Sequence, residues 1–382
     1  MDFSLTETQK GLVRDARIFA EAEFPLYADE ADAHETFPRD LWKKGCDCGL
    51  VGVFWDQAYG GRGLGFLEHA LIMEEFWRVD PGCGQAVLGA LFGSQMIHLF
   101  GTKEQKRRYL TPLARGEAIM GSAITEPDAG SDVSSVATRA ERKDGRYILN
   151  GNKMFISNGS IADYMTVLCV THPEEENRHR RQSVLIVETD REGFEANKLR
   201  GKLGIRASDT AEVTFSNVFV PEDHLVGEPG RGFYHFMEFF NHTRVHICAQ
   251  GVGVAQGAFE RTVKHVKSRR QFGKPLGSFQ AIQFRLAEMA TRIEAARSLY
   301  WRAGWNIDHG IVDHGLVAMA KWFAGEVGVY VAGEAVRIHG GIGVLRDYGI
   351  ERLYRDAKIV EIYEGTKEIE KLIVARNILG RM

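Results

Sequence analysis

The stretch Ala211-Glu212-Val213-Thr214-Phe215 alternates polar and apolar side chains, and this two-residue period predicts a strand with one buried face. Apolar and β-branched residues fill two further runs, residues 164–170 and 183–187, which predict buried strands. Tyr147-Ile148-Leu149-Asn150-Gly151 predicts a strand that enters a hairpin turn at its Asn-Gly pair. These runs share one region of the chain, which we therefore expect to form a compact β domain.

Helical periodicity dominates on both sides of this β region. Before it, Phe19, Ala20 and Phe24 follow the spacing of a helix until Pro25 interrupts the run. After it, apolar residues recur at alternating steps of four and three and predict one face of a long helix in an antiparallel bundle. The members of this stripe are Ile282, Leu286, Met289, Ile293, Ala296 and Tyr300.

The order of these regions predicts a mostly α fold with a central β domain. We expect an N-terminal α-helical domain over residues 1–120, a small β-barrel-like domain over 121–230 and a C-terminal four-helix bundle over 231–382. Gly251, Gly253 and Gly257 are spaced to let neighbouring helices of the bundle approach closely. A parallel nucleotide-binding sheet is disfavoured, because the predicted strands do not alternate with helices.

The composition is that of a soluble globular protein of 382 residues with a formal net charge of −3. This charge gives no attraction to nucleic acid or to an anionic membrane surface. We find no apolar run approaching the roughly 20 residues that span a bilayer, and no signal peptide at the N-terminus. The cysteines are odd in number and scattered, so we expect no disulfide framework and a cytoplasmic location.

The stretch Ile362-Tyr363-Glu364-Gly365-Thr366 holds one carboxylate between an aromatic ring and a glycine. A carboxylate walled by apolar groups has a raised pKa, which suits a general base, and such a group contributes roughly 10²–10⁴-fold in rate. The alternative reading is structural, because a Glu-Gly pair commonly closes a helix or forms a turn.

Two other patterns are weaker signals of function. The glycine-rich segment Tyr59-Gly60-Gly61-Arg62-Gly63-Leu64-Gly65 lacks the full spacing of a phosphate-binding or dinucleotide-binding loop, so it predicts a flexible loop. His242 and His246 are four residues apart, but no third ligand lies nearby, so we expect no metal site.

Six motifs, taken in order, resemble those of the acyl-CoA dehydrogenase family, and the resemblance covers essentially the whole chain. They are Ala123-Ile124-Thr125-Glu126-Pro127-Asp128-Ala129-Gly130-Ser131-Asp132, Asn150-Gly151-Asn152-Lys153-Met154-Phe155-Ile156-Ser157-Asn158, Lys202-Leu203-Gly204-Ile205-Arg206, Arg269-Arg270-Gln271-Phe272-Gly273, Gly340-Gly341-Ile342-Gly343 and Tyr363-Glu364-Gly365-Thr366. The family's fold agrees with the three regions described above.

The resemblance implies that FAD binds between the β domain and the C-terminal bundle of a homotetramer. It places Ile124 and Thr125 along the flavin ring and Ser131 at the border of cofactor and acyl-CoA. This chain has Phe155 and Ser157 where relatives usually have tryptophan and threonine. Phe155 can still cover a ring face, and the Ser157 hydroxyl can still donate a hydrogen bond to the flavin.

A second group of implied FAD contacts lies in the third region. Arg269, Gln271 and Phe272 match a loop that reaches the FAD of a neighbouring subunit, where a planar guanidinium suits a pyrophosphate. The remaining implied FAD contacts are Gln280, Arg337, Ile338, His339, Gly340, Gly341, Thr366 and Glu368.

For the substrate, the resemblance implies acyl-CoA contacts from Asn241, Arg244, Tyr363 and Gly365. Some relatives carry their catalytic glutamate where this chain has Thr243, so the resemblance assigns the base to Glu364. The implied reaction is α,β-dehydrogenation of an acyl-CoA thioester. Glu364 removes the α-proton, hydride passes to the flavin, and electrons then pass to an electron-transfer flavoprotein.

Three alternatives stay open at this point. A glutaryl-CoA-type dehydrogenase also uses a Tyr-Glu-Gly-Thr base, and Arg78 keeps that reading open, although the adjacent Asp80 would repel a distal carboxylate. The same scaffold can instead saturate an enoyl-CoA or pass electrons to oxygen. From another class, a DNA-associated flavoprotein of low turnover would need a basic stripe, which the acidic balance disfavours.

Overall fold

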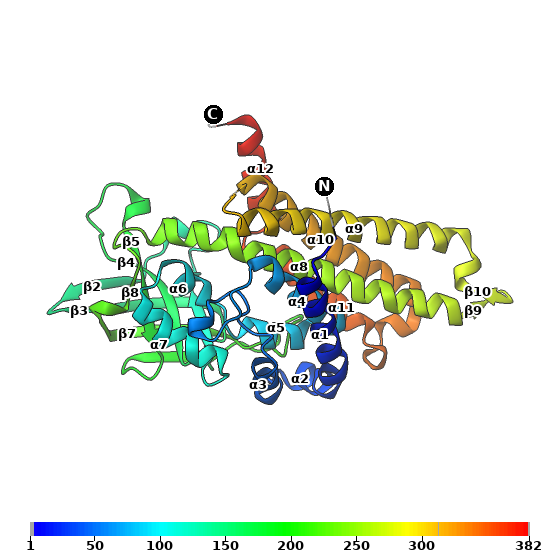
Figure 1. Cartoon of the computed structure of the whole chain (residues 1–382), viewed down its shortest axis with the longest axis horizontal. Coiled ribbons are helices and arrows are strands. Elements are labelled where there is room, and N and C mark those ends of the chain that lie inside the picture. Colours follow the sequence, from blue (N-terminus) through cyan, green and yellow to red (C-terminus); the bar gives the residue numbers. More distant parts are fainter. Residues whose placement is uncertain (1–3, 312, 381–382) are drawn as a thin grey trace.

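The computed structural model describes residues 4–311 and 313–380. Its first part is helical and packs around an apolar core that continues into the C-terminal helices (Figure 1). Thr6 caps the first helix with a side-chain hydrogen bond, and Pro25 follows that helix closely. The helices of this part are α1 (Glu7–Glu23), α2 (Ala28–His34), α3 (Arg39–Asp47), α4 (Phe66–Val79), α5 (Pro81–Gly89), α6 (Ser94–Phe100) and α7 (Lys103–Ala114).

Among the described residues, the middle part of the chain forms one sheet of eight strands. Seven of them follow the order β6-β7-β3-β2-β4-β5-β8, and the eighth, β1, pairs with β4. Most neighbours are antiparallel, whereas β1 and β2 each pair parallel with β4. The strands are β1 (Met120–Ala123), β2 (Arg139–Lys143), β3 (Arg146–Ser157), β4 (Tyr164–Val170), β5 (Gln182–Glu188), β6 (Phe194–Lys198), β7 (Thr210–Pro221) and β8 (Leu225–Val226).

Strands β4 and β5 are buried on both faces, which explains why the sequence reads there as nearly continuous apolar runs. Val184 and Ile186 face the core shared with the helices, whereas Leu185 and Val187 face a separate core inside the β region. The sheet is thus joined to the helical parts through one face of these central strands.

The predicted hairpin turn at Asn150-Gly151 is wrong. The hairpin joins β2 to β3 at Asp144 and Gly145, and β3 continues through Gly151 as far as Ser157. At Gly151 the register against β7 shifts, and a Cβ there would lie 2.4 Å from the Thr138 hydroxyl oxygen. The glycine therefore serves a β-bulge in a long strand rather than a turn.

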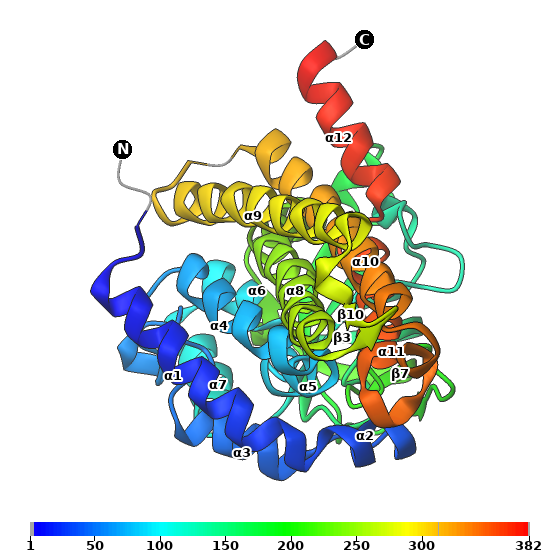
Figure 2. The same cartoon turned by 90° about the vertical axis from the view of Figure 1, so that its right-hand side faces the viewer.

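The C-terminal part is built on three long helices, α8 (Gly232–Ser268), α9 (Gln280–Asp308) and α10 (His314–His339), followed by α11 (Ile350–Ala357) and α12 (Lys367–Leu379). Figure 2 shows α8 enclosed by α4, α9 and α10, whereas α12 projects from the body. A small antiparallel hairpin, β9 (Arg270–Gln271) and β10 (Lys274–Pro275), connects α8 to α9.

The helix α10 and the turn after it, His314–Val344, are long and apolar enough to cross a membrane by length and composition. One such helix is weak evidence for a membrane span, because the core helix of a soluble protein meets the same criteria. Here, 67% of the most apolar window is buried inside the protein. Since α10 packs against α8, α9 and α12, we interpret it as a core helix of the bundle.

Glycines bring α8 into direct contact with its neighbours, as the sequence predicts. A Cβ at Gly257 would lie 2.0 Å from the Arg78 carbonyl oxygen of α4, and one at Gly253 would lie 2.4 Å from the Glu74 carbonyl oxygen. At Gly251 the nearest atom is the Ala324 carbonyl oxygen of α10, at 2.5 Å. Each of these distances is shorter than any real Cβ contact, so α8 requires glycine here.

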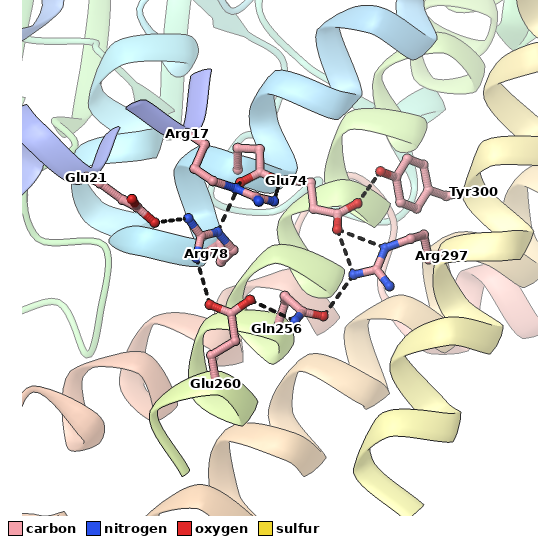
Figure 3. A network of polar contacts seen from close by, with 9 residues as sticks. Arg17, Glu21, Glu74, Arg78, Gln256, Glu260, Arg297 and Tyr300 are labelled. Carbon is pink, nitrogen blue, oxygen red and sulfur yellow. Dashed lines mark hydrogen bonds and ion pairs between the residues drawn. The ribbon is translucent and has the colours of Figure 1, made fainter. Parts of the chain in front are cut away.

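A network of buried and half-buried charges also ties α4 to α1, α8 and α9 (Figure 3). Glu74 of α4 accepts hydrogen bonds at 2.9 and 2.8 Å from Arg297 and one from the Tyr300 hydroxyl. Arg78, one turn along α4, pairs with Glu260 of α8 at 2.7 Å. Its other nitrogens pair with Glu75 and with Glu21 of α1. These contacts fix the N-terminal helices against the bundle.

This architecture confirms the predicted fold class: helices, a central β region and a second helical part. The apolar stripe of α9 is confirmed as well, since Met289, Ile293, Ala296 and Tyr300 are buried. The β region, α8 and the loop before α12 meet along a large cavity.

Candidate active site

One cavity of about 1200 Å³ lies where the β region, α8 and the segment before α12 meet. Residues from all three parts of the chain line it. Of the residues that the sequence assigns to the site, the cavity brings together Ile124, Thr125, Ser131, Phe155, Ser157, Asn241, Arg244, Tyr363, Glu364, Gly365 and Thr366. This volume exceeds that of a typical drug-sized pocket of roughly 300–1,000 Å³, so it has room for more than one large ligand.

Glu364 projects into this cavity from a strained turn. Its φ is +57°, a left-handed conformation that is unfavourable for a residue with a Cβ, and Gly365 follows at φ +104°. The Thr243 hydroxyl of α8 donates a hydrogen bond of 2.6 Å to Glu364 Oε2. The Glu364 backbone N–H has no hydrogen-bond partner among the described residues, so it is free to donate to a ligand.

Buried charged side chains hold the turn at Glu364 and Gly365 in place. Arg244 Nε donates to the Glu364 carbonyl oxygen at 3.0 Å and lies 3.1 Å from Glu370 Oε1. Lys321 of α10 donates to the Gly365 carbonyl oxygen. A Cβ at Gly365 would lie 2.0 Å from Glu370 Oε1, so no larger residue fits against this carboxylate. Three helices, α8, α10 and α12, therefore fix the backbone on both sides of the Glu364 side chain.

The same surroundings set the protonation of the site. Burial raises the pKa of Glu364 to about 7, and the nearby Glu370 adds to this, whereas Thr243, Arg244 and Lys321 oppose it. Burial lowers the pKa of Lys321 to about 8 against the pull of Glu370, and burial raises the pKa of Glu370. A carboxyl group with a pKa near neutrality is matched to proton transfer in both directions at physiological pH.

The opposite wall comes from the β region and is held by a buried ion pair. Lys153 is fully buried, and its Nζ donates to the Ile124 carbonyl oxygen at 2.9 Å and to Glu126 Oε1 at 2.8 Å. Glu126 also accepts from the backbone N–H groups of residues 137 and 138. Met154 N–H donates to the Thr125 carbonyl oxygen at 2.9 Å. These bonds fix the segment that presents Ile124 and Thr125 to the cavity.

This wall fits a flat aromatic ligand with polar edges. Phe155 has φ +60° and is 65% exposed at the cavity, so its ring is available to pack against a planar group. The hydroxyls of Thr125 and Ser157 make no hydrogen bond to any described residue, and both residues line the cavity. Free hydroxyls and an uncovered ring are the features that a flavin ring would use.

The other residues that the sequence assigns to the cofactor do not line this cavity. Arg269, Gln271 and Phe272 lie at the β9–β10 hairpin, where Phe272 is 92% exposed, at the end of the molecule opposite β2 and β3 (Figure 1). His339 stacks on His265 near the end of α8, with ring centroids 4.2 Å apart. This distant group, which we call the hairpin-end group, contains Arg269, Gln271, Phe272, Gln280, Arg337, Ile338, His339, Gly340 and Gly341. Glu368 is exposed on α12, outside both groups.

Sequence reasoning missed the charges beneath the turn and the hydroxyl that holds the carboxylate. Lys321 had a visible signal, because it interrupts an otherwise apolar run in α10 and such a lysine must be buried. Glu370 had none, since its segment Lys367-Glu368-Ile369-Glu370-Lys371 reads as an exposed helix. The resemblance marks Thr243 only as the position of a replaced base, and it gives no sign that Thr243 donates to Glu364. Within residues 4–311 and 313–380, no group of three or more His, Cys, Asp or Glu side chains is placed to hold a metal ion.

Together these features define an enzyme whose cavity combines one buried carboxylate with a wall that fits a flat cofactor. Comparison with known proteins identifies the class. The acyl-CoA dehydrogenase N-terminal, middle and C-terminal domain models match residues 6–117, 121–218 and 230–379. The chain therefore belongs to the acyl-CoA dehydrogenase family and is an oxidoreductase.

Its relatives span nearly its full length. The acryloyl-CoA reductase (NADH) of Anaerotignum propionicum is 41% identical over 100% of this chain and 97% of the relative. The solved butyryl-CoA dehydrogenase of Megasphaera elsdenii is 35% identical, covers 99% of this chain and 100% of its own, and superposes with a TM-score of 0.94. A chain solved in work on the electron transferring flavoprotein of Acidaminococcus fermentans is 39% identical over 100% of both chains, with a TM-score of 0.96.

The cofactor of this family is FAD, and solved structural neighbours of this chain hold FAD or its reduced form. The cavity wall described above fits that cofactor on its own evidence, because the Thr125 and Ser157 hydroxyls are free and the Phe155 ring is uncovered. The expectation of a flavoprotein is thereby confirmed.

Proposed function

We propose that this oxidoreductase catalyses the α,β-dehydrogenation of an acyl-CoA thioester, with Glu364 removing the α-proton. The observation that carries the proposal is the Glu364 carboxyl group itself, which has a pKa of about 7 and is held toward the cavity by Thr243. Its unpartnered backbone N–H can donate to the thioester oxygen and so acidify the α-carbon. When bound, FAD supplies the acceptor for the hydride from the β-carbon.

In this proposal the cavity residues divide by wall. Ile124, Thr125, Phe155, Ser157 and Thr366 hold FAD, with Glu368 nearby. Ser131, Asn241, Tyr363 and Gly365 contact the acyl-CoA. Arg244 binds on the substrate side mainly by holding the Glu364 turn, because its Nε is already shared between the Glu364 carbonyl and Glu370.

We further propose that the hairpin-end group binds the FAD of a second copy of the chain, in a cytoplasmic homotetramer. In support of this arrangement, Arg269, Gln271, Phe272 and Gln280 are exposed and lie far from the cavity of their own chain. The Phe272 side chain is 92% exposed, so it is suited to burial against another molecule.

The reverse reaction, saturation of a 2-enoyl-CoA, is a second candidate. It is favoured by the likeness to the acryloyl-CoA reductase of Anaerotignum propionicum. A carboxyl group with a pKa of about 7 is populated in both protonation states near neutral pH, so Glu364 can also return a proton to the α-carbon. For the electron partner we propose an electron-transfer flavoprotein, in line with the context of the Acidaminococcus fermentans chain.

The glutaryl-CoA alternative loses its basis in Arg78. The guanidinium of Arg78 is paired with Glu75, Glu21 and Glu260, and Arg78 does not line the cavity. It is therefore not available to a distal carboxylate. The DNA-associated alternative remains disfavoured by the net charge of −3.

The test is an anaerobic titration of the FAD-loaded protein with a panel of saturated acyl-CoAs, followed by the loss of flavin absorbance. We expect bleaching by at least one thioester and none in Glu364→Gln protein that retains its FAD. Bleaching at an unchanged rate in that variant would contradict the assignment of the base. If no saturated thioester bleaches the flavin, recovery of colour when enoyl-CoA is added to the reduced wild type would assign the reductase direction.

A further inference from the structure

Part of the cavity wall is both polar and buried, whereas a hydrocarbon acyl chain calls for an apolar lining. Four polar side chains form this part of the wall and are each less than a tenth exposed: His69 of α4, Gln85 of α5, and His246 and Gln250 of α8. We call these four residues the polar recess. They are neighbours, because the His69 and His246 rings lie 4.4 Å apart between centroids and Gln250 Nε2 lies 2.9 Å from Gln85 Oε1.

A directed chain of hydrogen bonds links the recess to the catalytic turn. The Tyr363 hydroxyl donates to Gln250 Oε1, and Gln250 Nε2 donates to Gln85 Oε1. Each amide oxygen thereby accepts one hydrogen bond, and the Gln85 amide N–H groups have no partner among the described residues. The chain therefore ends in a free donor at the wall of the cavity.

The histidines add further unpaired groups. His69 Nδ1 and His246 Nε2 are buried and have no hydrogen-bond partner among the described residues. Burial lowers the pKa of His69 to about 3 and that of His246 well below its usual value, so both rings are neutral. A buried polar atom without a partner costs free energy, and such atoms in a binding site commonly have a ligand partner.

The chemistry of the recess restricts what can fill it. A purely apolar acyl chain would leave the Gln85 amide and the two ring nitrogens unpaired, with the full cost of their desolvation. A carboxylate would find no cation, because neither Arg nor Lys is among the four recess residues and Arg78 is bound elsewhere. A neutral group that both donates and accepts hydrogen bonds satisfies both conditions.

We propose that the acyl group handled by this enzyme carries a neutral hydrogen-bonding substituent, such as a hydroxyl or carbonyl, remote from the thioester and bound in the polar recess. This inference rests on the proposed acyl-CoA function. Apolar Met73, Leu88 and Ile247 line the same cavity, so the rest of the acyl group is hydrocarbon.

The test compares pairs of thioesters in which a terminal methyl is replaced by a hydroxyl. Suitable pairs are pentanoyl-CoA with 4-hydroxybutanoyl-CoA, and hexanoyl-CoA with 5-hydroxypentanoyl-CoA. Dissociation constants are measured by calorimetry on FAD-loaded Glu364→Gln protein, which binds without consuming the ligand. We expect the hydroxyl member to bind about 3- to 10-fold more tightly in at least one pair, which is the range for one net hydrogen bond.

The variant Gln85→Met removes the free amide and keeps the side-chain length, so it should abolish this preference. Leu88→Met, an apolar replacement on the same wall, is the matched control and should retain it. The comparison within each pair needs no recess variant, so it stands even if Gln85→Met fails to fold.

Equal or weaker binding of the hydroxyl member in both pairs would overturn the inference, as water would then satisfy the recess. Tighter binding of glutaryl-CoA than of either member of the pairs would overturn its neutral character. Flavin bleaching of the wild type by any of these thioesters upholds the proposed reaction independently of the preference. If no thioester binds or bleaches the protein, the proposed function fails, and the inference fails with it.

Discussion

At the scale of single residues, Glu364 is under two kinds of stress. Its φ of +57° is unfavourable for a residue with a Cβ, and its carboxyl group is held in surroundings that disfavour the charge. Arg244 and Lys321 bind the carbonyls of residues 364 and 365, so the surrounding helices maintain this conformation. Strain and desolvation at one residue are typical of a site that trades stability for reactivity.

The pKa of Glu364 predicts a pH-dependent cost in stability. The carboxyl group titrates at about 7 in the folded protein against an ordinary value of 4.5. Between these two values the folded state keeps a proton that the unfolded state has lost, so the free energy of unfolding falls as pH rises through this window. Glu364→Gln should therefore raise the unfolding temperature of the protein by a few degrees at pH 8 and by almost nothing at pH 4.5.

The measurement is thermal unfolding of both proteins across this pH range at equal FAD content. Glu104→Gln, which removes an exposed carboxylate on α7, is the matched control and should show no such trend. A difference between Glu364→Gln and the wild type that does not change with pH would contradict the assigned pKa shift.

The Thr243 hydroxyl contributes to the pKa of Glu364. It donates to the charged form of Glu364, which lowers the pKa, while Arg244 and Lys321 lower the pKa further and Glu370 raises it. Thr243→Val removes one hydrogen bond to a charged group, so the rising limb of the kcat/KM profile against pH should move up by about one unit.

Thr243→Ser keeps the hydroxyl and should restore the original midpoint. A merely structural role for Thr243 would lower activity at every pH without moving the midpoint. That result would reject its role as a positioning residue for Glu364.

At the scale of elements, α8 connects the catalytic residues to the packing of the whole protein. It carries Thr243 and Arg244 in its first half and the glycines that contact α4 and α10 in its second half. Since a Cβ at Gly257 would lie 2.0 Å from the Arg78 carbonyl oxygen, Gly257→Ala forces α4 and α8 apart. We expect a loss of roughly 1–3 kcal/mol in the free energy of unfolding, as for overpacking elsewhere.

Chemical denaturation measures this loss. Gly11→Ala is the matched control, because Gly11 is a helical glycine of α1 whose added Cβ would have its nearest atom 4.0 Å away. That substitution should stabilise the protein by about 0.5–1 kcal/mol through helix propensity. Similar effects of the two substitutions would show that close packing at α8 does not limit stability.

The helices and strands also show which structural features can be predicted from the sequence alone. Periodicity predicted α9 and the doubly buried strands, because their apolar patterns reflect packing that every residue of the element shares. The bulge at Gly151 was read as a hairpin turn, because an Asn-Gly pair has the same local preference in both settings and only the pairing with β7 distinguishes them. The family resemblance implied eleven site residues that line the cavity, but it did not include Glu370 or the polar recess, which arise from contacts between distant helices.

At the scale of the whole molecule, the residues assigned to FAD lie at two places that one chain does not bring together. Ile124, Thr125 and Phe155 line the cavity, whereas Arg269 begins the hairpin after α8. Ser268 is 25 residues beyond Thr243 on the same helix, or roughly 37 Å at the rise of an α-helix. This separation supports the proposal that the hairpin-end group serves the FAD of another copy.

This arrangement predicts complementation between two inactive variants. Glu364→Gln lacks the base but has an intact hairpin, whereas Arg269→Ala has the base but a defective hairpin. If the hairpin acts across subunits, a mixed oligomer contains some sites with Glu364 from one chain and Arg269 from the other. Random mixing in equal amounts should restore activity to about a quarter of the wild-type sites.

Co-expression of the two variants with different affinity tags, followed by purification through both tags, provides the mixed oligomer for assays of FAD content and turnover. A mixture of Arg269→Ala with Arg337→Ala is the matched control, because both defects lie in the hairpin-end group and no mixed site regains a complete one. Turnover in the first mixture that does not exceed the sum of its parts would mean that Arg269 does not serve the site of another subunit. Recovery of turnover in the control mixture would mean that one complete site takes Arg269 and Arg337 from different chains. The two arginines would then not act as one group.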